Sequence, residues 1–342
     1  MPSAPSSLTP EFNIIARYFT RPANHAVLGV GDDCALVKIS AGCELAISTD
    51  TLVEGTHFFA TANAEKLGHK ALAVNLSDLA AMGAKPKHVM LALTLPQPLP
   101  GIDEAWLAEF SRGFFKLADA FDVELIGGDT TRGPLSMTLT VLGEIEAGRA
   151  LRRDGAQIGD DIWVSGNLGG AALALMHMQG KIALPPHIFA QVENQLHRPA
   201  PRVALGAALV GLASAAIDIS DGLVADLSHI CERSNLSALI EYRHLPLAPA
   251  FLALGAYLDA SVSNECALGG GDDYELCFTA PASVRSRIEQ AGAECGVAVS
   301  KIGCMQAFDS GQRVKVVDAS GRDVTPKKSG YDHFAALADK PS

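Results

Sequence analysis

The sequence predicts a protein of two domains that both combine α-helices with β-strands, and three observations support this prediction. The chain has 342 residues, which corresponds to about two domains at the usual domain size. Apolar runs of strand length alternate with longer segments in which apolar residues recur at helical spacing. Hydrophobic residues make up 48% of the chain, enough to bury a large core. The pattern of strands and helices starts again near residue 149, so we expect domains at 1–148 and 149–342.

Four strands and two helices are predicted in the first domain. The strands are short apolar runs that end at turn residues such as Pro96, Gly127 and Gly128. They lie in CELAISTD (about 44–48), KHVMLALTLP, VELIGGDTTRG and LSMTLTVLGEIEA. The helices are NAEKLGHKALAVNLSDLAAMGA and GIDEAWLAEFSRGFFKLADAF, and the second has a clear helical period.

The second domain is predicted to begin with a strand at 161–165. Helices are expected in GNLGGAALALMHM, in PHIFAQVENQLHRPAPR up to Pro199, and in the low-polarity run Val203–Ile217. The later elements are strands in ALIEY and YELCFTA, a helix at about 284–291, and a hairpin in QRVKVVDASGRDVTP.

Composition and charge exclude several classes of protein. The 38 acidic and 27 basic residues give a net charge of −11, which argues against a nucleic-acid partner, because binding nucleic acid requires clustered Lys and Arg. The seven cysteines are odd in number and lack CxxC spacing, so neither a disulfide framework nor a zinc site is predicted. The N-terminal MPSAPSSLTPEF lacks the basic and apolar regions of a signal peptide, and Val203–Ile217 is too short for a membrane span. We expect a soluble, cytoplasmic protein with no membrane partner.

Five short stretches carry the chemical signal, and they are GVGDDCA, STDTLVEGTHF, NLSDLAAMGA, GGDTTRG and IDISDG. Each is expected to place an aspartate at the end of an apolar strand or inside an apolar helix. Mg²⁺ prefers such hard oxygen donors and shares its coordination shell with phosphates, and neighbouring glycines let backbone N–H groups approach phosphate oxygens. The spread of aspartates therefore predicts a polyphosphate site with several metal ions.

Asp78 illustrates the argument, because its helix is apolar nearly all round from Ala71 to Met82 and is expected to be buried. A buried carboxylate is strongly destabilising unless it is paired or bound to a metal. Pairing with Lys70, with Lys85 or with a helix end is the alternative to metal binding.

Other signatures of nucleotide and hydrolytic sites are missing from the sequence, namely GxxxxGK[ST], an HRD and DFG pair, GxGxxG after a strand, HExxH and GxSxG.

A Gly-Asp turn explains one of the two aspartates in GVGDDCA, with Asp32 bonded to its own backbone. The GNLGG stretch is compatible with phosphate binding at a helix N-terminus but is typical of a tight turn, and no role is assigned to it. Both a functional and a structural role stay open for His57, which follows the acidic strand. The basic groups near the acidic turns are Arg132, Arg149, Arg152 and Arg153.

Seven blocks together resemble the bacterial thiamine-monophosphate kinase family. They cover nearly the whole chain in order, at Gly29–Ala35, Ser48–Phe58, Lys70–Ala84, Leu125–Gly133, Ile217–Leu223, Gly270–Phe278 and Gly330–Phe334. That family belongs to a superfamily of ATP-using enzymes with aminoimidazole ribonucleotide synthetase, selenophosphate synthetase and a hydrogenase maturation protein. The resemblance implies an α/β N-terminal domain that binds ATP and Mg²⁺, an α+β C-terminal domain, and a homodimer in which N-terminal strands of both subunits form one barrel. It also implies ATP-dependent phosphorylation of thiamine monophosphate to thiamine diphosphate.

The family pattern also implies a role for individual residues. The implied Mg²⁺ ligands are Asp33, Ser48, Thr49, Asp50, Asp78, Asp129, Asp218 and Asp221. The implied ATP contacts are Gly128, Asp129, Arg153 and Ser220, and the implied contacts with thiamine phosphate are His57, Asp272 and Tyr331. No catalytic base is implied, because the acceptor phosphate is already ionised and the main task is to neutralise and align two anions.

One position departs from the family, and two other classes of protein stay open. The family commonly reads GGEDYEL where this chain has GGDDYEL, so the acid at Asp272 is shorter by one methylene. A sister synthetase would activate an oxygen or a selenide. A selenide enzyme typically has a reactive Cys or selenocysteine near its N-terminus, whereas Cys34 follows the aspartate pair here. The other class is a non-catalytic nucleotide-binding module, against which the retained set of acids argues.

Overall fold

The computed structural model describes residues 10–96, 103–327, 330 and 331. The chain divides into two compact units. The first unit consists of Met1–Leu79 and Ala84–Gly148, and the second of Ala80–Gly83 and Arg149–Ser342.

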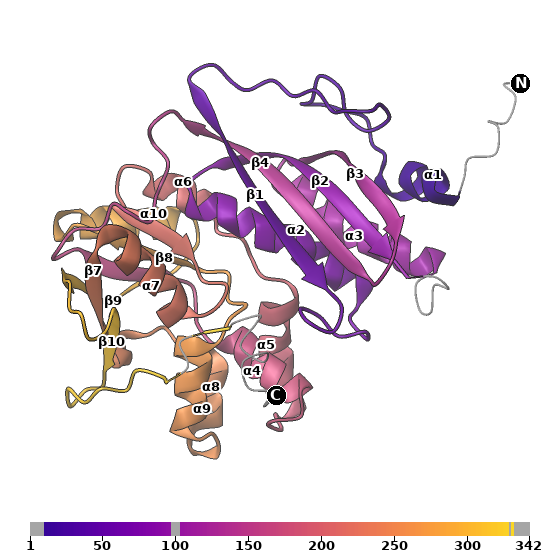
Figure 1. The fold of residues 1–342 in the computed structure, drawn as a ribbon. Coiled ribbons are helices and arrows are strands. Elements are labelled where there is room, and N and C mark those ends of the chain that lie inside the picture. The colour runs from indigo at the N-terminus through magenta and orange to yellow at the C-terminus, as the bar shows by residue number, and fades with distance from the viewer. Residues whose placement is uncertain (1–9, 97–102, 328–329, 332–342) are drawn as a thin grey trace, which may run out of the picture. The chain divides into compact units, whose positions relative to one another are not determined.

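The first unit contains an open four-stranded sheet with helices on one of its faces (Figure 1). The strand order is β1-β4-β2-β3, in which β2 and β3 are parallel and the other neighbours antiparallel. The parallel pair is connected by a crossover through α3, as such pairs require. The elements are α1 (Pro10–Ile14), the π-helix η1 (Ile15–Phe19), β1 (Cys43–Val53), α2 (Ala64–Ala81), β2 (Lys85–Leu95), α3 (Glu104–Ala120), β3 (Glu124–Arg132) and β4 (Ser136–Glu146).

The core of the first unit lies between this sheet and the helices α2 and α3. The prediction that α2 is buried nearly all round is confirmed, since Leu72, Leu76 and Leu79 are at most 1% exposed. The periodic apolar face of α3 buries Phe110 and Phe114 completely. In the described residues β1 and β3 remain edge strands, so this sheet does not close into a barrel on its own.

Two strands of the first unit are longer than the sequence predicts, and this changes where the aspartates stand. β1 continues through Asp50 to Val53, and β3 continues past Gly127 through Asp129 to Arg132. The prediction that these aspartates follow the ends of their strands is therefore wrong. Hydrogen bonding to a neighbouring strand keeps the chain extended beyond the point where the local turn signals predict a break.

The second unit is built on a six-stranded sheet in the order β10-β7-β9-β5-β8-β6, in which β10 and β7 are parallel and the other neighbours antiparallel. Its strands are β5 (Asp161–Ser165), β6 (Ala215–Asp218), β7 (Leu236–Glu241), β8 (Leu276–Ala280), β9 (Val299–Ala307) and β10 (Val314–Val317). Its helices are α4 (Gly170–Met178), α5 (Pro186–His197), α6 (Val203–Leu209), α7 (Leu223–Ser234), α8 (Pro249–Leu254), α9 (Ala260–Asn264) and α10 (Arg285–Glu294). Short helical turns are η2 (Tyr242–His244), η3 (Gly255–Tyr257), η4 (Glu265–Gly269) and η5 (Ala282–Val284).

The apolar run Val203–Ile217 is not one helix, as the sequence predicts, but a short helix followed by a strand. α6 ends at Leu209, Gly211 adopts a φ of +79°, and β6 begins at Ala215. A left-handed residue ends an α-helix, and glycine adopts this conformation without strain. The chain is then free to pair with β8, and β6 carries Asp218 at its end.

β9, in the interior of the six-stranded sheet, has no counterpart in the sequence prediction. Its sequence VSKIGCMQA lacks regular alternation of apolar and polar residues. A Cβ at Gly303 would lie 2.0 Å from the carbonyl oxygen of Leu239, so the close approach of β7 requires glycine there. The predicted C-terminal hairpin is reduced to β10 and an isolated bridge between Val317 and Asp323.

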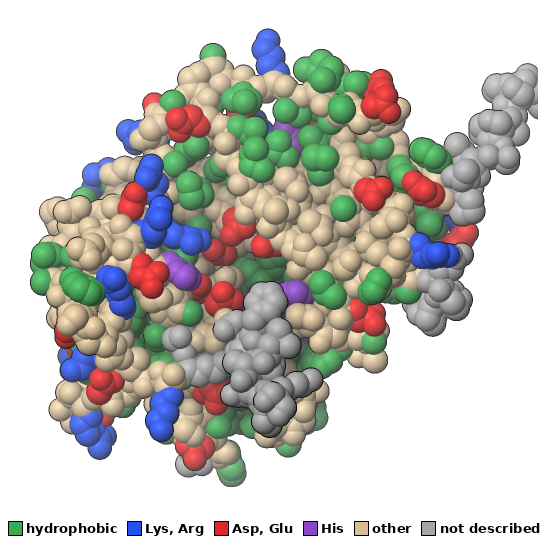
Figure 2. Space-filling view, viewed as in Figure 1, with side chains coloured by type: hydrophobic (Ala, Val, Ile, Leu, Met, Phe, Trp, Pro, Cys, Tyr) green, Lys and Arg blue, Asp and Glu red, His purple; other side chains and the backbone are tan. Residues whose placement is uncertain are grey.

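The surface and the helices bear on possible partners. Among the described residues, no helix has the length and apolar character that crossing a membrane requires. On the face drawn in Figure 2, Lys and Arg side chains are interspersed with Asp and Glu and do not gather into a continuous basic patch.

His88, on β2, is a buried histidine between carboxylates. It is 6% exposed, and its Nδ1 lies 3.8 Å from Oε2 of Glu124. Burial lowers the pKa of His88. The charges of His25 and Lys87 lower this pKa further, whereas the charges of Glu124 and Glu144 raise it. A histidine whose folded-state pKa lies below its unfolded value resists protonation in the fold. As the pH drops below about 6.5, the unfolded chain therefore binds the proton more readily than the folded protein, and the free energy of unfolding falls.

We expect the substitution His88→Gln to flatten this pH dependence between about pH 7 and about pH 5. Urea denaturation at several pH values in this window measures the slope. The exposed His187 supplies the control, since His187→Gln should leave the slope of the wild type unchanged. A wild-type slope in His88→Gln would mean that other groups set the pH dependence.

Candidate functional site

In the first unit, β1 lies against α2 and brings three predicted site residues to one junction. The hydroxyl of Ser48 donates to Oδ2 of Asp78 at 2.5 Å, and the backbone N–H of Asp50 donates to Oδ1 of Asn75 at 3.1 Å. Asn75 is 1% exposed, and its side-chain nitrogen donates to the carbonyl of Ala71 at 3.0 Å. The buried amide of Asn75 therefore connects the backbone of β1 to that of α2.

Residue spacing explains this match between strand and helix. Ser48 and Asp50 are two apart on a strand and share one face, while Asn75 and Asp78 are three apart on a helix and share one side. The two pairs meet at the β1–α2 junction. Asp78 is half-buried and not fully buried as the sequence predicts, because its side of α2 faces polar residues of β1. Asn75 is a site residue that the sequence analysis missed, and its signal is an amide inside an apolar helix.

Thr49 and His57 are engaged away from this junction. The hydroxyl of Thr49 donates to the carbonyl of Leu139 at 2.8 Å, on the opposite face of β1. His57 closes the turn after β1, where its Nδ1 accepts the N–H of Val53 at 3.0 Å and its own N–H donates to the Val53 carbonyl at 2.9 Å. In the neutral ring the proton therefore lies on Nε2.

The other predicted residues of the first unit stand on β3 and on the loop before β1. A Cβ at Gly128 would lie 1.8 Å from the carbonyl oxygen of Leu91, so the pairing of β3 with β2 alone requires glycine at this position. Asp32 accepts the backbone N–H of Asp33 at 2.9 Å, as expected of a turn residue. Asp33 and Asp129 are exposed. In the described part of this unit, no hydrogen bond joins them to the β1–α2 junction.

In the second unit, the turn between β6 and α7 is organised by Asp226, for which the sequence analysis made no prediction. One oxygen of Asp226 accepts the backbone N–H groups of Ser220, Asp221 and Gly222, each at 3.0 Å. Asp226 is 3% exposed, and Asp218, at the end of β6, is 5% exposed. Burial, and then the charge of Asp221, raise the pKa of Asp226 to about 7 against the opposing effect of the three N–H donors. The sequence signal is an acid in the first turn of a helix that follows a glycine turn.

The glycine-rich segment before β8 lies on this same turn, although it is distant in sequence. The N–H of Asp272 donates to the carbonyl of Ser220 at 2.9 Å, and the N–H of Tyr274 donates to the carbonyl of Ile219 at 2.8 Å. A Cβ at Gly271 would lie 2.4 Å from the Ser220 carbonyl oxygen. Glycine therefore permits the close approach of the two segments.

The backbone at Asp272 adopts a positive φ of 69°. Asp is one of the few residues enriched in this left-handed region. This conformation gives a physical reason for the shorter acid at a position where the resemblance implies Glu.

The last described residues also reach this turn. The N–H of Tyr331 donates to the carbonyl of Asp221 at 3.1 Å, and its side chain is 48% exposed. A Cβ at Gly330 would lie 2.8 Å from the same carbonyl oxygen. The rest of the block GYDHF lies outside the described residues. The second unit thus gathers predicted residues from three separate blocks, namely Asp218, Ser220, Asp221, Asp272 and Tyr331.

Two other features of the second unit are not part of this cluster. Arg153 is exposed, and its carbonyl accepts the hydroxyl of Ser234 at 2.9 Å, at the far end of α7. Over the 12 residues of this helix the separation from the turn is about 18 Å. The sequence of the GNLGG loop is compatible with phosphate binding. In the structure, however, the N–H of Gly169 in this loop donates to both carboxylate oxygens of Asp273, at 2.9 and 3.1 Å. Burial raises the pKa of Asp273 well above its ordinary value, although the N–H of Gly169 opposes this.

The donors gathered in both units are the hard oxygens that Mg²⁺ prefers. Within the described ranges, no three His, Cys, Asp or Glu side chains converge closely enough to hold a metal by themselves. The first unit nevertheless has donors of the type that Mg²⁺ prefers. The hydroxyl of Ser48 and the carboxylates of Asp50 and Asp78 belong to the β1–α2 junction. Mg²⁺ is usually held by one or two carboxylates together with water and substrate phosphates.

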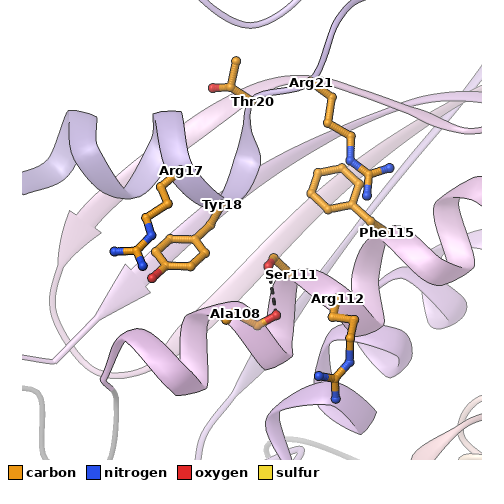
Figure 3. Close-up of a pocket in the computed structure, with 8 residues that line it drawn as sticks. All are labelled: Arg17, Tyr18, Thr20, Arg21, Ala108, Ser111, Arg112 and Phe115. Atoms are coloured by element: carbon orange, nitrogen blue, oxygen red, sulfur yellow. Dashed lines mark hydrogen bonds between the residues drawn. The ribbon is translucent and has the colours of Figure 1, made fainter. Parts of the chain in front are cut away.

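A pocket of about 210 Å³ in the first unit is lined by none of the predicted site residues (Figure 3). Its lining residues are Arg17, Tyr18, Thr20, Arg21, Ala108, Ser111, Arg112 and Phe115. Each of the three arginines is paired with a carboxylate, and these belong to Glu104, Asp119 and Glu109. The pocket therefore has little excess positive charge with which to bind a phosphate.

Comparison with known proteins identifies the family. Residues 31–145 match the family model described as AIR synthase related protein, N-terminal domain. Thiamine-monophosphate kinase of Salmonella typhimurium is 47% identical over 329 residues, which cover 95% of this chain and 98% of that protein.

Solved structures agree with the sequence relatives. Thiamine-monophosphate kinase from Stenotrophomonas maltophilia has a TM-score of 0.78 at 46% identity and covers 89% of this chain and 94% of its own. A structure described as AaThiL complexed with AMPPCP and TMP has a TM-score of 0.73 at 30% identity, with coverage of 89% and 92%. Because these similarities extend over nearly the full length of each chain, this protein belongs to the thiamine-monophosphate kinase family.

Proposed function

We propose that this protein transfers the terminal phosphoryl group of ATP to thiamine monophosphate and so forms thiamine diphosphate. The observation that carries the proposal is the family relation, since a relative 47% identical over nearly the full length is a thiamine-monophosphate kinase. The related AaThiL structure with AMPPCP and TMP adds support, because it contains an ATP analogue together with TMP.

The acceptor is itself a phosphate, and this determines what the protein has to do. Phosphate oxygens are ionised at neutral pH, so a strong general base is not needed. Two anions must be aligned and their mutual repulsion lowered. The carboxylates at the β1–α2 junction repel phosphate directly, so their contribution depends on a cation.

Mg²⁺, when bound, supplies the positive charge that neutralises the phosphate oxygens. The side chain of Thr49 lies on the opposite face of β1. We therefore propose that Thr49 binds Mg²⁺ through its backbone carbonyl. Asn75 fixes the backbone of Asp50, and the Ser48 hydroxyl orients the carboxylate of Asp78. The proposed ligands are Asp33, Ser48, Thr49, Asp50, Asp78, Asp129, Asp218 and Asp221.

The remaining proposed contacts divide between the two substrates. A carboxylate at Asp272 suits the positively charged thiazolium ring or the amino group of thiamine. The backbones of Ser220 and Asp272 are hydrogen-bonded at 2.9 Å, so the residues proposed to contact the two substrates are adjacent in one turn. The proposed ATP contacts are Gly128, Asp129, Arg153 and Ser220, and the proposed thiamine phosphate contacts are His57, Asp272 and Tyr331.

We extend the proposal to a cytoplasmic homodimer in which first-unit strands of two subunits complete a barrel. The sheet face opposite α2 and α3 supports this arrangement. On it Ile47 is 61% exposed and Met90 41% exposed, and the hydroxyls of Thr49 and Thr140 are 3.0 Å apart. Exposed apolar side chains such as these are suited to burial against a second copy.

We expect purified protein supplied with MgATP and thiamine monophosphate to yield thiamine diphosphate, detected by chromatography. Free thiamine should be a poor acceptor, because it lacks the phosphate that receives the transferred group. Phosphorylation of free thiamine at the rate of its monophosphate would contradict direct transfer to a phosphate acceptor.

A further inference from the structure

The loop of residues 20–42, between η1 and β1, carries Asp33 and is drawn in indigo in Figure 1. Its middle part is a short hairpin. The N–H of Leu28 donates to the carbonyl of Leu36 at 3.1 Å, and the N–H of Leu36 donates back to the carbonyl of Leu28 at 2.8 Å. Asp33 stands in the turn of this hairpin.

Glu124, the first residue of β3, holds the incoming end of the loop. Its carboxylate accepts three consecutive backbone N–H groups, those of Asn24, of His25 at 3.1 Å and of Ala26 at 2.7 Å. The ring of His25 adds a contact of 2.9 Å between its Nε2 and Oδ1 of Asp122. Burial raises the pKa of Glu124, but the three N–H donors outweigh burial and the pKa lies below its ordinary value. An ionised carboxylate is the stronger acceptor for these bonds.

Glu144, on β4, holds the outgoing end. Its Oε1 accepts the backbone N–H of Ser40 at 2.8 Å, and its Oε2 accepts the Ser40 hydroxyl at 2.7 Å. Burial raises the pKa of Glu144, but the two bonds from Ser40 outweigh it and the pKa lies below its ordinary value.

Apolar packing adds little to these two attachments. Four large apolar side chains of the loop are between 36% and 68% exposed, namely Val27, Leu28, Leu36 and Ile39, and two more, Val30 and Val37, are half-buried. The placement of the loop on the first unit therefore depends largely on polar bonds. These are the bonds to two carboxylates that project from the sheet and, at the start of the loop, the ion pair of Arg21 with Asp119.

We infer that Glu124 and Glu144 are positioning residues, which hold both ends of the loop so that Asp33 is available as a metal ligand. The inference rests on the proposed function, in which Asp33 binds Mg²⁺. Both glutamates bind residues at the ends of the loop and leave the Asp33 carboxylate unused. A loop that is correctly placed only part of the time weakens metal binding in proportion to that fraction. Loss of either attachment should therefore raise the Mg²⁺ requirement more than it lowers the maximal rate.

The first part of the test needs no enzymatic activity. In ligand-free protein, hydrogen exchange at the amides of residues 24–26 should be faster in Glu124→Ala than in the wild type. Glu124→Gln keeps the shape and one acceptor oxygen and should give an intermediate rate. Glu146→Ala is the matched control, because it removes an exposed carboxylate from the same strand as Glu144. Equal exchange in Glu124→Ala and the wild type would overturn the attachment.

The second part measures the Mg²⁺ concentration that gives half-maximal activity. It should rise about tenfold in Glu124→Ala and in Glu144→Ala, the size expected when about a tenth of the molecules keep the loop in place. kcat at saturating Mg²⁺ should change less, and Glu146→Ala should resemble the wild type. Faster exchange with an unchanged Mg²⁺ requirement would overturn the positioning role.

Direct binding of Mn²⁺ in the presence of ATP, followed by electron paramagnetic resonance, separates this inference from the proposed function. If the wild type fails to phosphorylate thiamine monophosphate but Glu124→Ala binds Mn²⁺ more weakly than the wild type, the proposed function is wrong and the positioning role stands. If Mn²⁺ binding is equal in the two proteins, the positioning role is wrong whatever the activity.

Discussion

Asp78→Asn should lower kcat for thiamine monophosphate by at least about 10²-fold, the effect expected of one preorganised electrostatic group. Asparagine retains the shape of the side chain and still accepts the Ser48 hydroxyl, which donates to Asp78 at 2.5 Å. It lacks the negative charge that attracts a cation. Buried apolar side chains such as Leu72, Leu76 and Leu79 supply the packing of α2, so the fold should be retained. Product formation at saturating MgATP measures kcat, and circular dichroism with thermal unfolding monitors the fold.

The same helix offers a matched control for this prediction. Ser77 is 0% exposed, and its hydroxyl has no hydrogen-bond partner among the described residues. Ser77→Ala should therefore leave kcat close to the wild-type value. Near-normal activity of Asp78→Asn at ordinary Mg²⁺ concentrations would make Asp78 a structural residue.

Asp226→Ala should destabilise the protein by about 3 kcal/mol or more and should also reduce activity. The substitution leaves the backbone N–H groups of Ser220, Asp221 and Gly222 without their acceptor in a partly buried turn. Each unsatisfied buried donor costs about 1–3 kcal/mol. Because Asp272 is bonded to the same turn, the proposed contacts for metal, ATP and thiamine phosphate should be disturbed together. Urea unfolding measures stability, and kcat/KM for each substrate measures the effect on the site.

Two further variants make this result specific. Asp226→Asn keeps the shape and one acceptor oxygen, so it should cost less than the alanine variant. Glu232→Ala removes an exposed acid from the same helix and should change the free energy of unfolding by no more than about 0.5 kcal/mol. An unfolding midpoint of Asp226→Ala equal to that of the wild type would show that the three bonds do not stabilise the turn.

Elements with a strong local signal are predictable from this sequence. The apolar residues of α2 predict its burial, and the period of α3 predicts the face that buries Phe110 and Phe114. β9 and the full length of β1 and β3 are not predictable in this way, because they depend on pairing with distant strands. The split of Val203–Ile217 depends on one glycine that takes a left-handed conformation.

The same division applies to the candidate site. The acidic and glycine-rich blocks predict a phosphate and metal chemistry, since residue type and order are enough to indicate hard oxygen donors. They do not predict that Thr49 turns away from the β1–α2 junction, which follows from the strand's alternation once it pairs with β4. They also do not predict Asn75 or Asp226, whose importance lies in the backbone N–H groups that they bind.

The sequence by itself determined the family, the order of the site blocks and the chemical class of the ligands, because these depend on which residues are present and in which order. Only the tertiary structure decided which of those residues share a face and which support them. Asp272 and Tyr331 join the turn of Ser220 and Asp221 through backbone bonds between segments far apart in the chain. Strand register and the satisfaction of buried backbone groups are set by such distant partners, and no local pattern records them.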